Sequence, residues 1–351
     1  MNRPRRSDRR ALHELVQAPA ALSVPGNLIA GAAAANNVRP RRWDMRALTK
    51  LVRAPAALST PGDVIARTTA ANNVRPRRWD MRALTELVRA PAALSVPGDV
   101  IAGAAAANDI RPRTAGLAGA SVLLYWAGMA ANDWADRDID VKERPERPIP
   151  SGRISARAAL ALAAGLTGAA VVGAGLAGGR KALNIAVPLA ATVWAYDLGA
   201  RHPGVMAACR ALNVLLGASG GDLKRAVWPA ATVFAHTYTV TLLSGSEVDG
   251  ATARLPKRTL AGTAAVAAAA GGAPVSAGLA GWYALQYGRP QLDAVREPSA
   301  ANIRKSVGAG ILHLPALQGA LIARAGAPLL GLAVAAAAPL ARRLARKVSP
   351  T

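Results

Sequence analysis

The sequence predicts an all-α protein built as a nine-helix integral membrane bundle. Three observations support this prediction: small apolar residues dominate, long stretches carry no charge, and the charged residues gather between those stretches. The chain is 52% hydrophobic but only 4% aromatic, with 33 Gly. Small residues at this frequency suit helices that pack backbone to backbone in lipid.

The uncharged stretches have the length of membrane spans. A spanning helix needs about 17 to 25 mostly apolar residues, and a soluble bundle would place charges on the outer faces of its helices. Two further candidate spans, 88–107 and 202–222, each contain charged residues. The seven uninterrupted stretches are 114–132, 158–179, 182–196, 226–246, 259–288, 306–323 and 325–341.

The basic residues indicate how the bundle is oriented. Short cytoplasmic loops are enriched in Lys and Arg, and the loop after residue 132 carries six of them between Arg137 and Arg157. We therefore expect an integral protein of a bacterial-type plasma membrane, with the N-terminus and the active site in the cytoplasm. Because the net charge of +23 sits in loops beside membrane lipids, nucleic acid is not an expected partner.

Several other classes of site are excluded. The single Cys209 cannot form a disulfide framework or a thiolate zinc site, and the four His have no paired metal-ligand spacing. The sequence also contains no dinucleotide-binding GxGxxG with its acidic partner, no Walker A loop and no GxSxG elbow.

The N-terminal region is a tandem duplication. Residues 15–50, 51–86 and 87 onward are near-copies with a period of 36, opening with LVQAPAALSVPGNLIAG, LVRAPAALSTPGDVIAR and LVRAPAALSVPGDVIAG. The third copy leads directly into the second span and supplies the first helix. We therefore divide the chain into residues 1–86, expected to be poorly ordered or interfacial, a transmembrane domain at 87–345, and a tail at 346–351.

An acidic stretch follows the second span. Residues four apart share a helix face, so Asn132, Asp136 and Asp140 line up over two turns, with Asp133 adjacent. Carboxylates on one face repel each other unless a cation lies among them, and Mg²⁺ prefers carboxylates together with substrate phosphate oxygens. The stretch therefore predicts a site for a metal-bound diphosphate on a lipid-like tail.

The same residues resemble a known family. The pattern NDxxDxxxD followed by RPIPSG is similar to the first signature of the UbiA superfamily of intramembrane prenyltransferases, in a divergent bacterial branch similar to that of ebo-type gene clusters. The resemblance implies nine transmembrane helices and two acidic motifs at the cytoplasmic side, with Mg²⁺ holding a prenyl diphosphate. It implies catalytic roles for Asp133, Asp136 and Asp140 and metal binding by these and Asn132.

Further positions are expected to bind the diphosphate. Arg forks match phosphate oxygens, and Arg147 lies in the Pro-flanked loop after the acidic stretch. Within an otherwise apolar span, Arg210 and Asn213 lie one turn apart, and an intramembrane charge usually faces a polar cavity. The resemblance adds Arg89 and Arg201, which match basic positions of the family that contact the diphosphate. The positions assigned to the diphosphate are therefore Arg89, Arg147, Arg201, Arg210 and Asn213.

The substrate pocket and the second acidic motif complete the predicted site. Tyr196, Asp197 and Tyr238 are assigned to the pocket. Where the family has DxxxD, this chain has Glu247 and Asp249, which lie two apart and would not share a face of a regular helix. A helix that ends near Gly250 would let both carboxylates reach one metal ion.

These features predict a Mg²⁺-dependent prenyltransferase. It would move a prenyl group from a polyprenyl diphosphate to an aromatic or hydroxylated, lipid-soluble acceptor inside the membrane. Two alternatives stay open at this point. One is a UbiA-like terpene cyclase, in which an alkene of the substrate captures the cation, and the other is a non-catalytic protein that binds or transports polyprenoid lipids.

The duplication leads to a first prediction. Because the third copy contains the whole first span, deletion of residues 2–72 should leave membrane insertion intact. The amount of protein in the carbonate-resistant membrane fraction, compared with the full chain, measures this. A truncated chain found mainly in the soluble fraction would contradict it.

Overall fold

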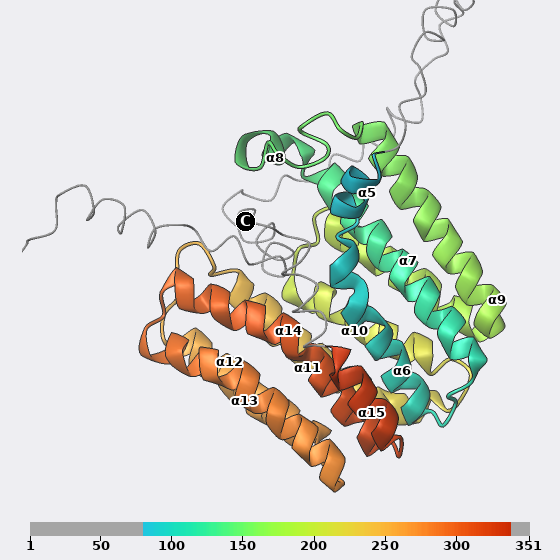
Figure 1. The fold of residues 1–351 in the computed structure, drawn as a ribbon, viewed down its shortest axis with the longest axis vertical. Coiled ribbons are helices and arrows are strands. Elements are labelled where there is room, and N and C mark those ends of the chain that lie inside the picture. Colours follow the sequence, from blue (N-terminus) through green and yellow to red (C-terminus); the bar gives the residue numbers. More distant parts are fainter. Residues whose placement is uncertain (1–79, 338–351) are drawn as a thin grey trace, which may run out of the picture.

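The computed structural model describes residues 80–337, which form helices and no strand. The expectation for residues 1–79 and for the tail therefore lies outside the described residues. Figure 1 shows the helices running side by side in one bundle, with short connections at its two ends. The helices are α5 (Met81–Leu87), the 3-10 helix η2 (Ala90–Ser95), α6 (Val96–Ala106), α7 (Pro112–Ala135), α8 (Arg137–Glu143), α9 (Ala156–Asp197), α10 (Pro203–Gly217), α11 (Leu223–Ser244), α12 (Arg254–Ala270), α13 (Pro274–Arg296), α14 (Ala300–Arg324) and α15 (Pro328–Ala335).

The all-α membrane bundle is confirmed. Helices α7, α9 and α14 are long and apolar enough to cross a membrane, and α6 and α10 are shorter apolar helices. Two details at the N-terminal end differ from the predicted first span at 88–107. Regular helix begins only at Val96, after η2, and α5 crosses the predicted domain boundary between residues 86 and 87.

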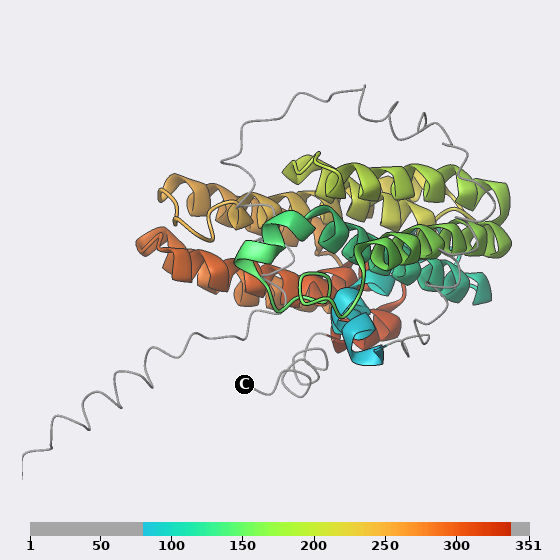
Figure 2. The same ribbon diagram turned by 90° about the horizontal axis from the view of Figure 1, so that it is seen from above.

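Two predicted spans are joined in α9. The backbone of Gly179 has φ 63° and ψ −156°, a conformation open to glycine, and it breaks the helix between the stretches 158–179 and 182–196. Trp194 Nε1 donates to Thr167 Oγ1 at 3.0 Å. The two halves of α9 therefore lie antiparallel, side by side, and the two light-green helices of Figure 2 show this hairpin from above.

The prediction of a single span at 259–288 is wrong. The chain instead forms α12 and α13, because Gly271 takes an extended conformation at the end of α12 and Pro274 occupies the first turn of α13. Glycine just past a helix end and proline at a helix start are common signals of helix boundaries. The prediction of one span relied on the absence of charged residues and did not take these signals into account. The described residues thus contain one more apolar helical segment than the nine predicted spans.

Helices α6 and α10 pack at the backbone through glycine. A Cβ on Gly103 of α6 would overlap the carbonyl oxygen of Val214, and a Cβ on Gly217 of α10 would overlap the carbonyl oxygen of Val100. Small residues at a helix interface allow this close approach. The pair α6 and α10 lies between the two parts of the bundle, α7 with α9 on one side and α11 to α15 on the other (Figure 1).

Several segments that are distant in the sequence meet at one end of the bundle. The chain returns there at the end of α7, in α8, at both ends of α9, and in the loop after α11. Ser155 caps α9 by accepting a hydrogen bond from the backbone N–H of Ala158 at 3.2 Å, which fixes where the loop after α8 re-enters the bundle. In Figure 1, α8 and α5 mark this end.

The glycine contact gives a second prediction. Gly103→Ala should lower the free energy of unfolding by about 1–3 kcal/mol, because the added Cβ overpacks against the α10 backbone. Gly119→Ala in α7 is the matched control, since no atom of the described residues lies within 4 Å of its Cβ position. Thermal unfolding of the purified protein in detergent measures both variants. Equal unfolding temperatures for the two would contradict the close α6–α10 contact.

Candidate active site

Three aspartates of the acidic stretch are buried at the end of α7. Asp133, Asp136 and Asp140 are 3%, 4% and 1% exposed, whereas the side chain of Asp138 is 85% exposed. Although α7 ends at Ala135, the backbone N–H of Asp136 bonds to the carbonyl of Asn132 and that of Asp140 to Asp136, both at 2.9 Å. The helical register therefore continues across the break, and the predicted shared face is present.

Arginines from three other segments pair with these carboxylates. Arg89 Nη2 lies 2.9 Å from Asp133 Oδ1, and Arg147 Nη1 lies 3.3 Å from the same atom and 2.6 Å from Asp140 Oδ2. Arg201 pairs with Asp136. The structure thus brings together Arg89, Arg147 and Arg201 as predicted, because each lies where its segment returns to the acidic end of the bundle.

A fourth arginine was not predicted. Arg144 Nη1 lies 3.8 Å from Asp140 Oδ1, one turn further along α8. Burial, reinforced by the positive charges of Arg147 and Arg89, lowers the pKa of Arg144 below its usual range. The spacing of four from Asp140 was the available signal for this contact. Four guanidinium groups thus surround the three carboxylates, and guanidinium groups can also pair with phosphate oxygens.

Arg89 reaches Asp133 from an uncommon backbone conformation. It has φ 47° and ψ 50° and directly precedes η2, in which Pro91 is the second residue. A left-handed conformation is unfavourable for a residue with a side chain and persists where the surrounding structure enforces it, often at functional sites. The Arg89 side chain is only 12% exposed, so it is aimed into the site rather than into solvent.

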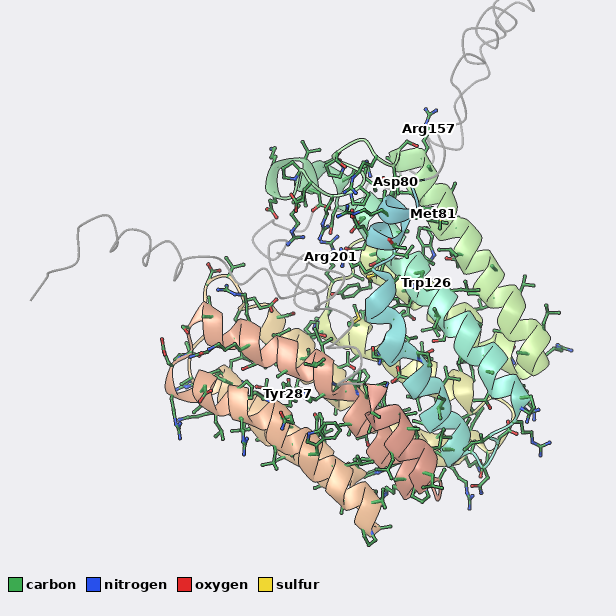
Figure 3. All side chains as sticks on the ribbon, in the orientation of Figure 1. Asp80, Met81, Trp126, Arg157, Arg201 and Tyr287 are labelled. Carbon is green, nitrogen blue, oxygen red and sulfur yellow. The ribbon has the colours of Figure 1, made fainter. Side chains whose placement is uncertain are left out.

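The end of α9 adds two buried polar groups. Tyr196 and Asp197 are both 5% exposed, and within the described part of the chain neither the Tyr196 hydroxyl nor Asp197 Oδ2 has a hydrogen-bond partner. Asp197 Oδ2 lies against α7, 3.5 Å from the position of a Cβ on Gly128. In the view of Figure 3, Arg201, which follows α9, lies below Asp80 and Met81, and Tyr287 lies in the part formed by α12 to α14.

The second acidic motif is divided between the interior and the surface. Glu247 is 2% exposed, and neither of its carboxylate oxygens has a hydrogen-bond partner among residues 80–337, whereas Asp249 is exposed. Burial raises the pKa of Glu247 to about 7, with the Arg304 guanidinium opposing the shift in part. Arg304 Nη1 donates to the Glu247 carbonyl at 2.7 Å. The structure therefore does not bring Glu247 and Asp249 into one environment.

Arg210 and Asn213 lie elsewhere. Their contacts are with Asp99 of α6: Arg210 Nε lies 2.9 Å from Asp99 Oδ2, and Asn213 Nδ2 donates to the same oxygen at 3.2 Å. From the sequence, Asp99 was only one of the charged residues within the candidate span 88–107, and no role was predicted for it. Asp99 could have been identified in the same way as Arg210, because a charged residue within an apolar segment requires a partner.

The contacts of Tyr238 in α11 are also not with Asp133, Asp136 or Asp140. It is half-buried and stacks on Phe234, with ring centroids 6.2 Å apart. Its neighbour His236 is buried and contacts the hydroxyl of Tyr283 through Nδ1 at 2.8 Å. This contact belongs to the interface of α11 with α13 and not to the acidic end.

The donor set at the acidic end suits a magnesium–diphosphate complex. Carboxylates are the ligands that Mg²⁺ takes from proteins, and guanidinium forks match phosphate oxygens. Among residues 80–337, no three His, Cys, Asp or Glu side chains converge closely enough to hold a metal ion by themselves. The aspartates and arginines are residue types that fit a magnesium–diphosphate complex. In this structure the aspartates are paired with the arginines.

The fold is similar to solved structures. A chain described as digeranylgeranylglyceryl phosphate synthase in membranes superimposes with a TM-score of 0.55 and 16% sequence identity, covering 70% of this chain and 98% of the other. At this level of identity the likeness concerns the fold alone.

Curated proteins match over shorter segments. The digeranylgeranylglyceryl phosphate synthase of Methanothrix thermoacetophila is 61% identical over 41 residues, 12% of this chain and 15% of that protein. The 4-hydroxybenzoate octaprenyltransferase of Paraburkholderia phymatum is 55% identical over 49 residues, 13% of this chain and 17% of that protein. The chain thus spans less than a fifth of the length of these two relatives.

A family model covers a larger part of the chain. It is the model of the UbiA prenyltransferase family, and it matches residues 96–290, more than half of the 351 residues. This segment includes the acidic stretch and ends within α13. Together with the apolar helices, the match identifies an integral membrane protein. The chain belongs to the UbiA prenyltransferase family.

Proposed function

We propose that this protein transfers a prenyl group from a polyprenyl diphosphate to an aromatic or hydroxylated, lipid-soluble acceptor within the membrane, with Mg²⁺ as cofactor. The observation that carries the proposal is the cluster of three buried carboxylates and four arginines at one end of an apolar helical bundle. Relatives named as prenyltransferases support the same reaction type.

The chain's own residues divide the work at the diphosphate. Asp133, Asp136 and Asp140 would hold the metal, which when bound neutralises charge on the departing diphosphate. The surrounding arginines bind the diphosphate oxygens and stabilise the charge that grows as the allylic C–O bond breaks. Because an anionic substrate competes for the arginines, its arrival releases the carboxylates from their present ion pairs.

The apolar bundle binds the prenyl chain of the substrate. The prenyl chain lies among the helices, where its burial costs little and where water is kept from the allylic cation. The acceptor nucleophile then bonds to the allylic carbon and loses a proton, while diphosphate leaves with the electrons of the C–O bond. Tyr196 offers a π-face of the kind that attracts a cation, and Asp197 follows it at the end of α9.

The carboxylates provide the third prediction. Asp136→Asn and Asp140→Asn should each lower prenyl transfer by about 10²-fold or more, because each removes a charge that the transition state requires. Transfer of a radiolabelled geranylgeranyl or longer prenyl group by membranes containing excess Mg²⁺ measures the effect. Chelation of divalent cations should abolish the activity of the wild-type protein.

The matched control lies in the same segment. Asp138→Asn changes the same chemical group on α8, but its side chain is 85% exposed and faces away from the cluster. Activity should stay within about twofold of wild type, since surface substitutions usually perturb little. If Asp136→Asn and Asp140→Asn transferred the prenyl group as well as Asp138→Asn does, the assignment of the cluster as the active site would fail.

We further propose that the acidic end faces the cytoplasm. The connections at this end are rich in Arg and Lys, including the loop after α8 and the start of α12, whereas the opposite end carries fewer basic residues. Short loops with this bias remain on the cytoplasmic side. The prenyl diphosphate would then enter from the cytoplasm, with its tail in lipid.

Single cysteines test this orientation as a fourth prediction. In a Cys209→Ala background, Asp138→Cys should react with a membrane-impermeant maleimide in inside-out vesicles and not in right-side-out vesicles. Lys224→Cys, exposed at the opposite end of the bundle, should show the reverse pattern. Reaction of Asp138→Cys from the outside would overturn the proposed orientation.

A further inference from the structure

A second group of charged residues lies inside the bundle, below the proposed active site. The Asp99 carboxylate of α6 is fully buried. Gln318 of α14 donates to its Oδ1 at 2.6 Å, while Arg210 and Asn213 of α10 contact its Oδ2 at 2.9 and 3.2 Å. This group, Asp99 with Arg210, Asn213 and Gln318, is called the Asp99 network below.

The Asp99 network also holds the backbone of the segment before α6. Gln318 Nε2 and Arg210 Nη2 donate to the Ser95 carbonyl at 2.8 and 3.2 Å, and Asn213 Nδ2 donates to the Val96 carbonyl at 3.2 Å. These carbonyls lie at the junction of η2 with α6. Side chains of α10 and α14 thus supply partners to backbone groups where the 3-10 helix changes into an α-helix.

The fit of Gln318 depends on Gly98. A Cβ at this position would overlap the Gln318 side-chain amide, so the absence of a side chain admits the amide to η2. Ser121 of α7 bonds to Asn213, which extends the network to a fourth helix. The segment η2 is therefore held from several sides by buried polar groups, each of which would be costly to leave unpaired.

The other end of the same segment carries Arg89. It is the residue immediately before η2, and its left-handed backbone directs its guanidinium to Asp133. The short stretch between Arg89 and Asp99 is the connection between the Asp99 network and the proposed active site. A shift of η2 would therefore move Arg89 relative to the carboxylates.

The duplicated copies in this chain vary at these two positions together. The third copy has Arg89 with Asp99, the second has arginine and aspartate at the equivalent positions 53 and 63, and the first has glutamine and asparagine at 17 and 27. Glycine is retained in all three copies at positions 26, 62 and 98. An aspartate at the position equivalent to Asp99 is thus found only in copies that also have an arginine at the position equivalent to Arg89.

We propose that the Asp99 network positions Arg89 for the substrate diphosphate, with Gln318 as a positioning residue that acts through η2. This inference rests on the proposed function, since it assigns the diphosphate as the ligand of Arg89. Arg210 and Asn213 then serve the diphosphate indirectly, by fixing the segment that presents Arg89, rather than by contact.

A double-mutant cycle tests the coupling as a fifth prediction. The full chain in detergent with Mg²⁺ is titrated with inorganic diphosphate by calorimetry, for the wild type, Gln318→Met, Arg89→Ala and the double variant. Gln318→Met keeps the side-chain volume and should weaken binding by about tenfold. In the Arg89→Ala background the same change should have no further effect, because the residue that it misplaces is gone.

Control variants separate positioning from a general loss of packing. Gln291→Met removes a comparable buried amide, which bonds Thr263 at 2.8 Å between α13 and α12, and should leave diphosphate binding unchanged. Gly98→Ala displaces the Gln318 amide without removing any hydrogen-bonding side chain and should reproduce the tenfold loss, again only with Arg89 present. It replaces Gln318→Met if that variant does not fold.

The outcomes distinguish the inference from the proposed function. A wild-type protein that binds no diphosphate contradicts the proposed function and the inference with it. Diphosphate binding with equal losses in the two backgrounds, or with no loss from either Gln318→Met or Gly98→Ala, supports the proposed function but overturns the positioning role. Loss in Gln291→Met as large as in Gln318→Met also overturns it.

Discussion

The structure depends on the cost of placing charge in an apolar interior. An ionised side chain buried away from water must be paired or neutralised, and inside a membrane bundle the alternatives are few. Here the buried aspartates of α6, α7 and α8 each meet an arginine from a different segment. These pairs determine which helices approach each other and at which depth, because a carboxylate left alone would destabilise the fold.

The pairs form two groups with different consequences. At the end of α7 the partners of the carboxylates are arginines from connections, where a ligand can exchange with them. Around Asp99 the partners come from α10 and α14 within the bundle, and they also satisfy the backbone carbonyls of Ser95 and Val96. The carboxylates and arginines at the end of α7 thus have the composition of a binding site. The Asp99 network has that of a structural contact between helices.

Small residues make both groups possible. Gly98 admits the Gln318 amide, and Gly103 and Gly217 let α6 and α10 meet at the backbone, so that Arg210 and Asn213 reach Asp99. Without a hydrophobic driving force between helices in lipid, such close packing and interhelical hydrogen bonds are what hold a bundle together. The high Ala and Gly content is therefore a requirement of the site as well as of the fold.

The sequence by itself determined the fold class, the family resemblance and the acidic face, because hydropathy and the four-residue helical period are local properties. It also placed Arg89, Arg147 and Arg201 near the carboxylates. Only the tertiary structure decided that Arg210 and Asn213 contact Asp99, and that Glu247 is buried while Asp249 is exposed. These outcomes depend on which helices become neighbours, and a long-range contact such as that between Asp99 and Gln318 leaves no periodic signal along the chain.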